Sequence, residues 1–111
     1  MTDTLLALIQ STQNLYERFE REFILDVQIP IFEEEVHELI AATQAKDSTT
    51  QHIAEETCDV FVTAIGMALA AGVSVEELMT QAQAVIQKND AKTHASHYVN
   101  EQGKIARRQS D

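Results

Sequence analysis

Residues that break helices are so scarce in this chain that a few long helices have to account for most of its length. Its 111 residues include only three glycines and one proline, whereas a fold of many short strands and tight turns needs more of both. A chain of this length is expected to form one domain. The sequence therefore predicts a single all-α domain over residues 1–111, in which the polar, basic segment 102–111 is flexible.

Apolar residues at helical spacing predict a bundle of four helices, over about residues 4–23, 31–46, 51–71 and 75–92. Asp3 or Thr2 is expected to cap the first helix. Pro30 suits the first turn of the second helix, because a proline there gives up no intrahelical hydrogen bond. Ser74 and Glu77 have the spacing of a capping box at the start of the fourth helix.

The third predicted helix is apolar on nearly every side from Val60 onward. A helix of this kind needs neighbours all round, and three other helices of a short chain cannot cover it completely. We therefore expect a homo-oligomer with this helix at or near the subunit interface. The run from Val60 to Val73 has 14 residues, which is too short to cross a bilayer. Small side chains permit close helix approach, at Ala64, Gly66, Ala68, Ala70 and Ala71.

Two pairs of carboxylates stand at i, i+3 spacing on successive predicted helices: Glu35 with Glu38, and Glu56 with Asp59. This spacing places both members of a pair on one face of a helix. On two antiparallel helices, the four carboxylates would converge on a hard divalent cation. Oxygen ligands of this kind suit Mg²⁺, which usually binds together with phosphates.

Two other interpretations of these acidic residues remain open. Charges on a helix commonly form a solvated face, but Glu56 and Asp59 precede the most apolar run, where unpaired carboxylates need compensation. Glu34 and His37 have the Glu-x-x-His spacing of di-iron four-helix proteins, which require the motif on a second helix. The second cluster has no histidine at that position, so Mg²⁺ is the preferred metal. Cys58, in the same stretch, is expected to be a small core residue.

The net charge of −10 and the pI near 4.7 argue against binding to nucleic acid or to an anionic membrane. A nucleotide substrate is compatible with this charge, because bound cations invert the local field. The N-terminal residues lack the basic start and the cleavage site of a secretory signal, and a single cysteine fits a reducing compartment. We therefore expect a cytoplasmic protein.

Basic residues gather toward the C-terminal end of the sequence. Lys88 and Lys92 lie one helical turn apart beside Asn89, where they either hold phosphate oxygens or complement the helix dipole. His94 and His97 have a spacing that permits metal binding, although a solvated segment is the simpler interpretation. A basic patch that either contacts substrate phosphates or aids solubility follows, at Lys104, Arg107 and Arg108.

The strings EEVHE (34–38) and EETCD (55–59) together resemble the EExxE…ExxD pattern of the MazG-like all-α nucleoside triphosphate pyrophosphohydrolases. The string KNDAK (88–92) is similar to a downstream substrate-binding motif of that family. The resemblance implies a Mg²⁺-dependent enzyme, with Mn²⁺ as a substitute ion, that cleaves an NTP or dNTP between the α- and β-phosphates. The implied products are a nucleoside monophosphate and pyrophosphate, and the implied role is nucleotide-pool housecleaning. A homodimer or a dimer-of-dimers tetramer is also implied.

The resemblance also implies roles for individual residues. It places catalytic groups, among them the one that orients a ligand or activates water, at Glu34, Glu35, Glu38 and Glu55. It assigns metal ligation to Glu35, Glu38, Glu56 and Asp59. Contacts to substrate phosphate or sugar fall to Lys88, Asn89 and Lys92. Two alternatives stay open: a non-enzymatic acidic helical interaction module, and a relative with a dedicated substrate such as dUTP or a phosphoribosyl-nucleotide.

Overall fold

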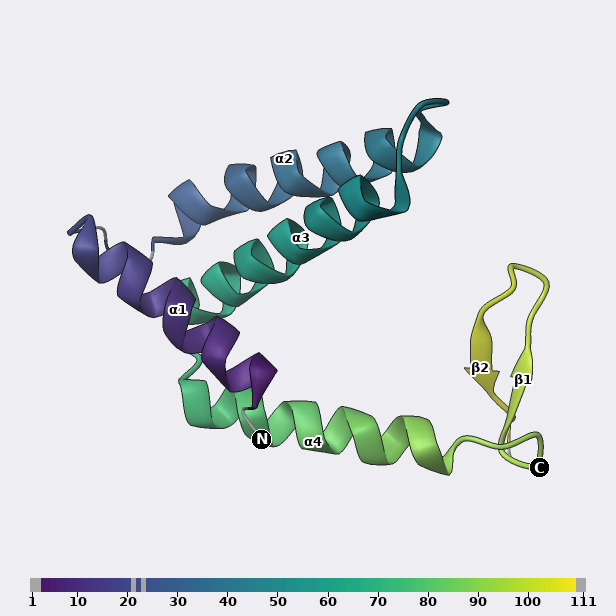
Figure 1. Cartoon of the computed structure of the whole chain (residues 1–111). Coiled ribbons are helices and arrows are strands. Elements are labelled where there is room, and N and C mark those ends of the chain that lie inside the picture. Colours follow the sequence, from purple (N-terminus) through teal and green to yellow (C-terminus); the bar gives the residue numbers. More distant parts are fainter. Residues whose placement is uncertain (1–2, 21, 23, 110–111) are drawn as a thin grey trace. The chain divides into compact units, whose positions relative to one another are not determined.

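The computed structural model describes residues 3–20, 22 and 24–109. In this part of the chain, four helices take up most of the length and a short hairpin follows them (Figure 1). The all-α fold class predicted from the sequence is confirmed. The elements, in chain order, are α1 (Thr4–Arg18), α2 (Leu25–Gln44), α3 (Thr50–Ala70), α4 (Val75–Ala91), β1 (His97–Val99) and β2 (Ile105–Arg107).

The chain forms two compact units, Met1–Leu78 and Met79–Asp111. In the first unit, α2 and α3 run antiparallel beside each other and form the main helix–helix contact (Figure 1). Helix α1 packs against α3 in the same unit. The pairing of α2 with α3 matters most for function, because these two helices carry the acidic residues singled out above.

Polar side chains cap the helix starts at the positions that the sequence predicts. Asp3 accepts a backbone N–H of the first turn of α1 at 3.2 Å. The Thr49 hydroxyl accepts the backbone N–H of His52 at 3.1 Å and so caps α3. At the start of α4, the Ser74 hydroxyl accepts the Glu77 N–H at 3.0 Å, and the Glu77 carboxylate accepts the Ser74 N–H at 3.3 Å. This reciprocal pair is the predicted capping box.

Residues with a positive φ follow the ends of α1 and α3. Gly72, with a φ of 90°, follows α3 at the position where glycine is favoured. Helix α1 ends at Arg18, earlier than predicted, and Glu20 has a φ of 54°. A residue in that region cannot continue a right-handed helix. The predicted end at Phe23 lies outside the described residues.

Helix α2 begins at Leu25 and contains Pro30, so the prediction that this helix starts at residue 31 is wrong. A proline in the second turn gives up only one backbone hydrogen bond, to the carbonyl four residues earlier. Tertiary contact compensates for it: Gln28 is 0% exposed, and its Nε2 donates to the Tyr16 hydroxyl of α1 at 2.8 Å. The buried amide fixes the first turn of α2 against α1, which local propensity does not reveal.

In the second unit, the chain leaves α4 and forms a hairpin that the sequence analysis did not predict. Strands β1 and β2 pair antiparallel, with His97 opposite Arg107 and Val99 opposite Ile105. The side chain of Asn100 accepts backbone N–H groups of residues 102 and 104, at 3.0 and 2.9 Å. Gly103 has a φ of 82°, which the tight turn requires. The two strands occupy only three residues each, so the usual sequence signal of a strand is too short to detect.

The apolar core of the single chain is small. Among the described residues, the buried hydrophobic side chains are those of Ile9, Ala42 and Ile65. Phe61 on α3 is 55% exposed, and Val85 and Ile86 on α4 are each 51% exposed. Cys58 is exposed as well, so its predicted core position is wrong. No helix in the described part of the chain combines the length and apolar character that a membrane crossing demands.

Candidate metal centre

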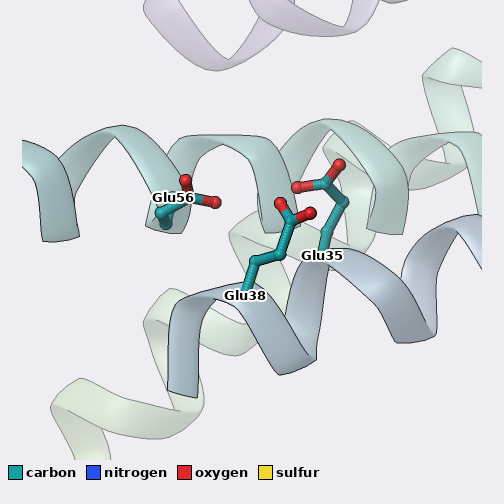
Figure 2. A group of neighbouring side chains, drawn as sticks. All are labelled: Glu35, Glu38 and Glu56. Carbon is teal, nitrogen blue, oxygen red and sulfur yellow. The ribbon is translucent and has the colours of Figure 1, made fainter. Parts of the chain in front are cut away.

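Three carboxylates from α2 and α3 meet between these two helices. Glu35 and Glu38 project from α2 toward α3, and Glu56 projects from α3 toward them (Figure 2). Each offers one carboxylate oxygen, and the three oxygens all lie within 4.8 Å of one another. The i, i+3 spacing on α2 and the antiparallel packing of α3 together produce this cluster, which we call the carboxylate cluster.

The carboxylate cluster is only partly buried, but its shielded oxygens need a compensating partner. Glu38 is exposed, whereas Glu35 and Glu56 are half-buried. One oxygen of Glu35 and one of Glu56 are shielded from solvent, and neither has a hydrogen-bond partner among the described residues. Shielding an unpaired carboxylate oxygen costs free energy unless a cation or a donor compensates for it.

The arrangement of these oxygens fits a hard divalent cation. Mg²⁺ binds oxygen ligands at about 2.0–2.1 Å, so two oxygens on opposite sides of one ion lie about 4 Å apart. Oxygens within 4.8 Å of one another are close to that separation. Mg²⁺ commonly takes only one or two carboxylates from a protein and fills its other positions with water and phosphate. Glu35, Glu38 and Glu56 are therefore the residues that could hold such an ion.

The electrostatics of Glu35 agree with a cation site. Burial raises the pKa of the Glu35 carboxyl above its ordinary value of 4.5. The negative charge of Glu38 and a hydrogen bond with it raise this pKa further, and the charges of Asp59 and Glu56 add to the effect. A positive ion among these carboxylates would reverse the repulsion.

The other acidic residues predicted for the site lie outside the three-residue cluster. Asp59 is exposed on α3, one turn from Glu56. Its negative charge nevertheless contributes to the raised pKa of Glu35. Glu34 is exposed on α2 and lines a surface hollow together with Glu38 and His37. The structure thus brings together three of the four predicted metal ligands, and metal ligation by Asp59 stays a prediction.

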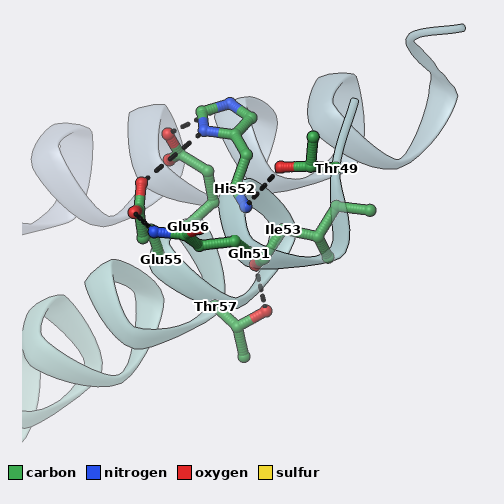
Figure 3. Close-up of polar contacts among 7 residues, drawn as sticks. All are labelled: Thr49, Gln51, His52, Ile53, Glu55, Glu56 and Thr57. Carbon is green, nitrogen blue, oxygen red and sulfur yellow. Dashed lines mark hydrogen bonds and ion pairs between the residues drawn. The ribbon is translucent and has the colours of Figure 1, made fainter. Parts of the chain in front are cut away.

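His52 is a residue of this site that the sequence analysis missed. Its Nδ1 lies 3.9 Å from Glu55 Oε2, and its Nε2 lies 3.8 Å from Glu56 Oε1 (Figure 3). Gln51 also donates to Glu55 Oε1, at 3.4 Å. The imidazole therefore connects Glu55, a predicted catalytic residue, with Glu56 of the carboxylate cluster. The spacing of His52 to the two glutamates, i+3 and i+4, is the sequence signal that reveals this contact.

A cavity of about 590 Å³ adjoins the carboxylate cluster at the α2–α3 turn. Glu38, Glu56 and His52 line it on the side of the cluster. Its other walls combine small apolar side chains of α2 with polar residues of the turn, namely Ala41, Ala42, Ala45, Asp47, Ser48 and Thr49. This volume lies within the range of small-molecule sites, which pair apolar walls with a few polar groups.

The predicted substrate-binding residues stand at the end of α4, in the second unit. Lys88 and Asn89 belong to the last turn of α4, and Lys92 follows it. All three side chains are exposed, and Lys92 Nζ donates to Asn89 Oδ1 at 3.4 Å. The three residues therefore lie together at one end of a helix, as their spacing in the sequence predicts.

Comparison with known proteins gave one match. A family model described as phosphoribosyl-ATP pyrophosphohydrolase matches residues 9–101. The match includes α2, α3, α4 and β1, and therefore all the predicted metal-binding and substrate-binding residues. No curated protein and no solved structure matches the chain.

Proposed function

The chain belongs to the phosphoribosyl-ATP pyrophosphohydrolase family, and from this premise we propose that it hydrolyses phosphoribosyl-ATP between the α- and β-phosphates. Membership makes the chain a pyrophosphohydrolase, a hydrolase that acts on phosphoric anhydride bonds. This family is part of the MazG-like superfamily, so the resemblance seen in the sequence is confirmed at that coarser level. The non-enzymatic interaction module is therefore not proposed.

The carboxylate cluster is the observation that carries this proposal. Glu35, Glu38 and Glu56 present convergent oxygens, two of them shielded and unpaired, beside a cavity of about 590 Å³. We propose that they hold Mg²⁺, for which Mn²⁺ can substitute, and that Asp59 supports the site through its charge or as a fourth ligand. A bound ion of this kind neutralises phosphate charge and polarises the phosphorus that is attacked.

The protein's own residues supply the remaining chemistry. Glu55 or Glu34 holds a water molecule and accepts its proton while the water oxygen attacks phosphorus. The P–O bond to the leaving pyrophosphate then breaks, and phosphoribosyl-AMP remains. His52 lies beside both glutamates, with its ring nitrogens 3.9 Å from a Glu55 oxygen and 3.8 Å from a Glu56 oxygen. Lys88, Asn89 and Lys92 contact phosphate or sugar oxygens of the substrate, where the two lysines neutralise phosphate charge.

The choice of phosphoribosyl-ATP over a general NTP or dNTP rests on the family. The sequence motifs favour a general nucleotide substrate and leave a phosphoribosyl-nucleotide as an alternative. The match with the family model favours that alternative. The carboxylate cluster itself does not favour phosphoribosyl-ATP over an NTP or a dNTP, because all these substrates share the triphosphate group. A housecleaning role was implied together with a general NTP or dNTP substrate. It does not follow from a phosphoribosyl-nucleotide substrate.

We further propose that the enzyme works as a homodimer or as a dimer of dimers. The single chain leaves much of its apolar surface open, and Phe61 of α3 is 55% exposed. Burial of such surface is the main driving force for stable association. The apolar half of α3 remains the proposed interface.

Pyrophosphate release from a panel of substrates tests the proposed activity. Phosphoribosyl-ATP, ATP, dUTP and other dNTPs are compared at equal concentration with and without Mg²⁺. We expect Mg²⁺-dependent turnover with the highest kcat/KM for phosphoribosyl-ATP. A preference for any dNTP would support general pyrophosphohydrolase activity instead, and absence of turnover for every substrate would refute the proposal.

A further inference from the structure

The charges of the chain are distributed unequally between its two units. Residues 79–111 contain five of the eight lysines and arginines but only three of the eighteen acidic residues. The second unit is therefore net positive in a chain whose net charge is −10. Concentrated positive charge in an acidic protein indicates a local anion-binding surface.

Three of these five basic residues line one cavity. This cavity has a volume of about 380 Å³, and its walls include Lys88, Lys92 and Arg107 together with Ser96 and His97. None of the described residues that line it carries a carboxylate. In the described part of the chain, none of the three basic side chains forms an ion pair with an acidic residue. We call this cavity the cationic pocket.

A second cavity adjoins the cationic pocket and shares Lys92 and His97 with it. It has a volume of about 480 Å³. Its walls include the ring of Tyr98, the apolar side chains of Val99 and Ile105, and the amide of Asn89. An aromatic face beside an amide suits a sugar or a base, which present both apolar faces and hydroxyl or nitrogen groups. We call this cavity the ring pocket.

Contacts around Arg108 hold the walls of both pockets in place. Arg108 Nε donates to the carbonyl of His94 at 2.8 Å, and its guanidinium lies 5.6 Å from the centre of the Tyr98 ring. The Ser96 hydroxyl lies 2.7 Å from His97 Nδ1 and fixes that ring. Arg107 is the last residue of β2 and lines the cationic pocket, whereas Arg108 follows the strand and contacts Tyr98. Arg108 thus stabilises the hairpin, whereas the side chain of Arg107 is available to the cationic pocket.

We propose that the second unit contains its own binding site for a phosphate monoester carried on a sugar. The phosphate occupies the cationic pocket, where Lys88, Lys92 and Arg107 neutralise it. The sugar extends into the ring pocket against Tyr98. If the proposed function holds, the natural ligand is the phosphoribosyl group of the substrate, which ATP and the dNTPs lack. The site then explains how the enzyme selects its substrate.

Ribose 5-phosphate is the probe that tests this site without any catalytic step. It is titrated into the full-length protein and its dissociation constant is measured by calorimetry, with ribose as the unphosphorylated control. We expect ribose 5-phosphate to bind and ribose not to bind. Arg107→Gln should weaken binding about tenfold, the range for loss of one charged hydrogen-bonding group. Lys104→Gln removes the same charge from the same hairpin but lines neither pocket, so it should bind like the wild type.

The outcomes separate this inference from the proposed function. Equal dissociation constants for Arg107→Gln and Lys104→Gln, or no binding of ribose 5-phosphate at all, would overturn the site even if phosphoribosyl-ATP is hydrolysed. Selective loss of binding in Arg107→Gln would support the site even if no nucleotide is hydrolysed. In an active enzyme, Arg107→Gln should raise KM for phosphoribosyl-ATP about tenfold and leave kcat largely unchanged, because the phosphoribosyl group does not react. Circular dichroism spectra confirm that each variant is folded.

Discussion

At the scale of single residues, the proposed metal site depends on the half-buried carboxylates of the α2–α3 pair. Glu35 and Glu56 each place one oxygen out of solvent without a partner, and the pKa of Glu35 is raised by burial and by its acidic neighbours. Such an arrangement destabilises the chain when metal is absent. The same residues therefore link stability, pH and metal binding, and each of these links is open to measurement.

Removal of the Glu35 charge should stabilise the metal-free protein at neutral pH. The native pKa of Glu35 is raised above 4.5, so the native state holds this proton more tightly than the unfolded state does. Ionisation of Glu35 therefore lowers stability as pH rises above about 4.5, and the loss is complete once pH exceeds the native pKa. Urea denaturation in a metal chelator should show that Glu35→Gln loses less stability than the wild type between pH 4.5 and neutral pH.

Glu33→Gln is the matched control for this experiment, because Glu33 stands on the same helix and outside the carboxylate cluster. Its pH dependence should follow that of the wild type. If the metal-free Glu35→Gln protein shows the same pH dependence as the wild type, the unfavourable ionisation of Glu35 in the native state is refuted.

The effect of Mg²⁺ on stability should distinguish Glu56 from Asp59. An ion present at 100 times its dissociation constant stabilises a protein that binds it only when folded by about 2.7 kcal/mol. We expect Glu56→Gln to abolish the stabilisation, because Glu56 belongs to the carboxylate cluster. Asp59→Asn should retain part of it, because Asp59 is exposed and outside the cluster.

Thermal melting with and without Mg²⁺ measures both variants of this pair against the wild type. An equal loss in the two variants would show that Asp59 is as strong a ligand as Glu56, as the sequence pattern predicts. A wild-type melting curve that does not respond to millimolar Mg²⁺ would count against the metal centre itself.

Catalysis should depend on Glu38 far more than on its exposed neighbour Glu33. Substitution of a residue that only hydrogen-bonds to a metal ligand already costs about 10–100-fold in metal affinity or activity. We therefore expect Glu38→Gln to lower kcat/KM for phosphoribosyl-ATP by at least about 100-fold. Glu33→Gln on the same helix serves as the control in the pyrophosphate-release assay. Wild-type activity in folded Glu38→Gln would remove Glu38 from the site.

At the scale of secondary-structure elements, α2 is the helix whose position matters most, and its first turn depends on a buried amide. Gln28 is completely buried and donates to the Tyr16 hydroxyl of α1. This contact keeps residues 25–30 helical through Pro30. Helix α2 carries Glu35 and Glu38, so the contact between α1 and α2 also supports the orientation of the carboxylate cluster.

Loss of the Tyr16 hydroxyl should destabilise the fold. Tyr16→Phe leaves the Gln28 amide buried without this acceptor, and a buried donor without a partner costs about 1–3 kcal/mol. Replacement of both partners, in Tyr16→Phe with Gln28→Leu, should cost less than the sum of the two single losses, because the Gln28 amide is then no longer buried without its acceptor. Urea denaturation of the wild type and the three variants measures the coupling. Additive losses in the double variant would contradict the proposed role of this hydrogen bond.

At the scale of the whole molecule, the apolar surface of the single chain exceeds what its small core uses. The fully buried large side chains among the described residues are those of Ile9 and Gln28. Phe61 is 55% exposed in the otherwise apolar half of α3. Large exposed apolar surfaces mark sites of association, which is the physical basis for the proposed homo-oligomer.

A charge at Phe61 should dissociate the proposed oligomer. Phe61→Glu buries an unpaired carboxylate in the interface, which association cannot compensate. Light scattering after size-exclusion chromatography should show a multiple of the 12.4 kDa chain for the wild type and a shift toward the monomer for Phe61→Glu. Gln44→Glu adds the same charge at an exposed site of α2 and should leave the mass unchanged. A monomeric wild type would refute the oligomer.

The sequence by itself determined the features that follow from neighbouring residues. The scarcity of glycine and proline and the spacing of apolar residues predicted four helices, and Asp3, Ser74 and Glu77 cap two of them as expected. The i, i+3 spacing likewise brought Glu35 and Glu38 to the same face of α2. These features are local, because they depend on hydrogen bonds and side-chain directions within one or two turns.

Only the tertiary structure decided which groups meet across elements. It selected Glu56 rather than Asp59 to join Glu35 and Glu38, because the packing of α3 on α2 turns one of the two inward. It extended α2 to Leu25, ahead of Pro30, where Gln28 is buried and contacts Tyr16 of α1. It also paired two three-residue strands and so formed the cationic pocket. Contacts between residues far apart in the chain depend on packing, and no local pattern in the sequence encodes them.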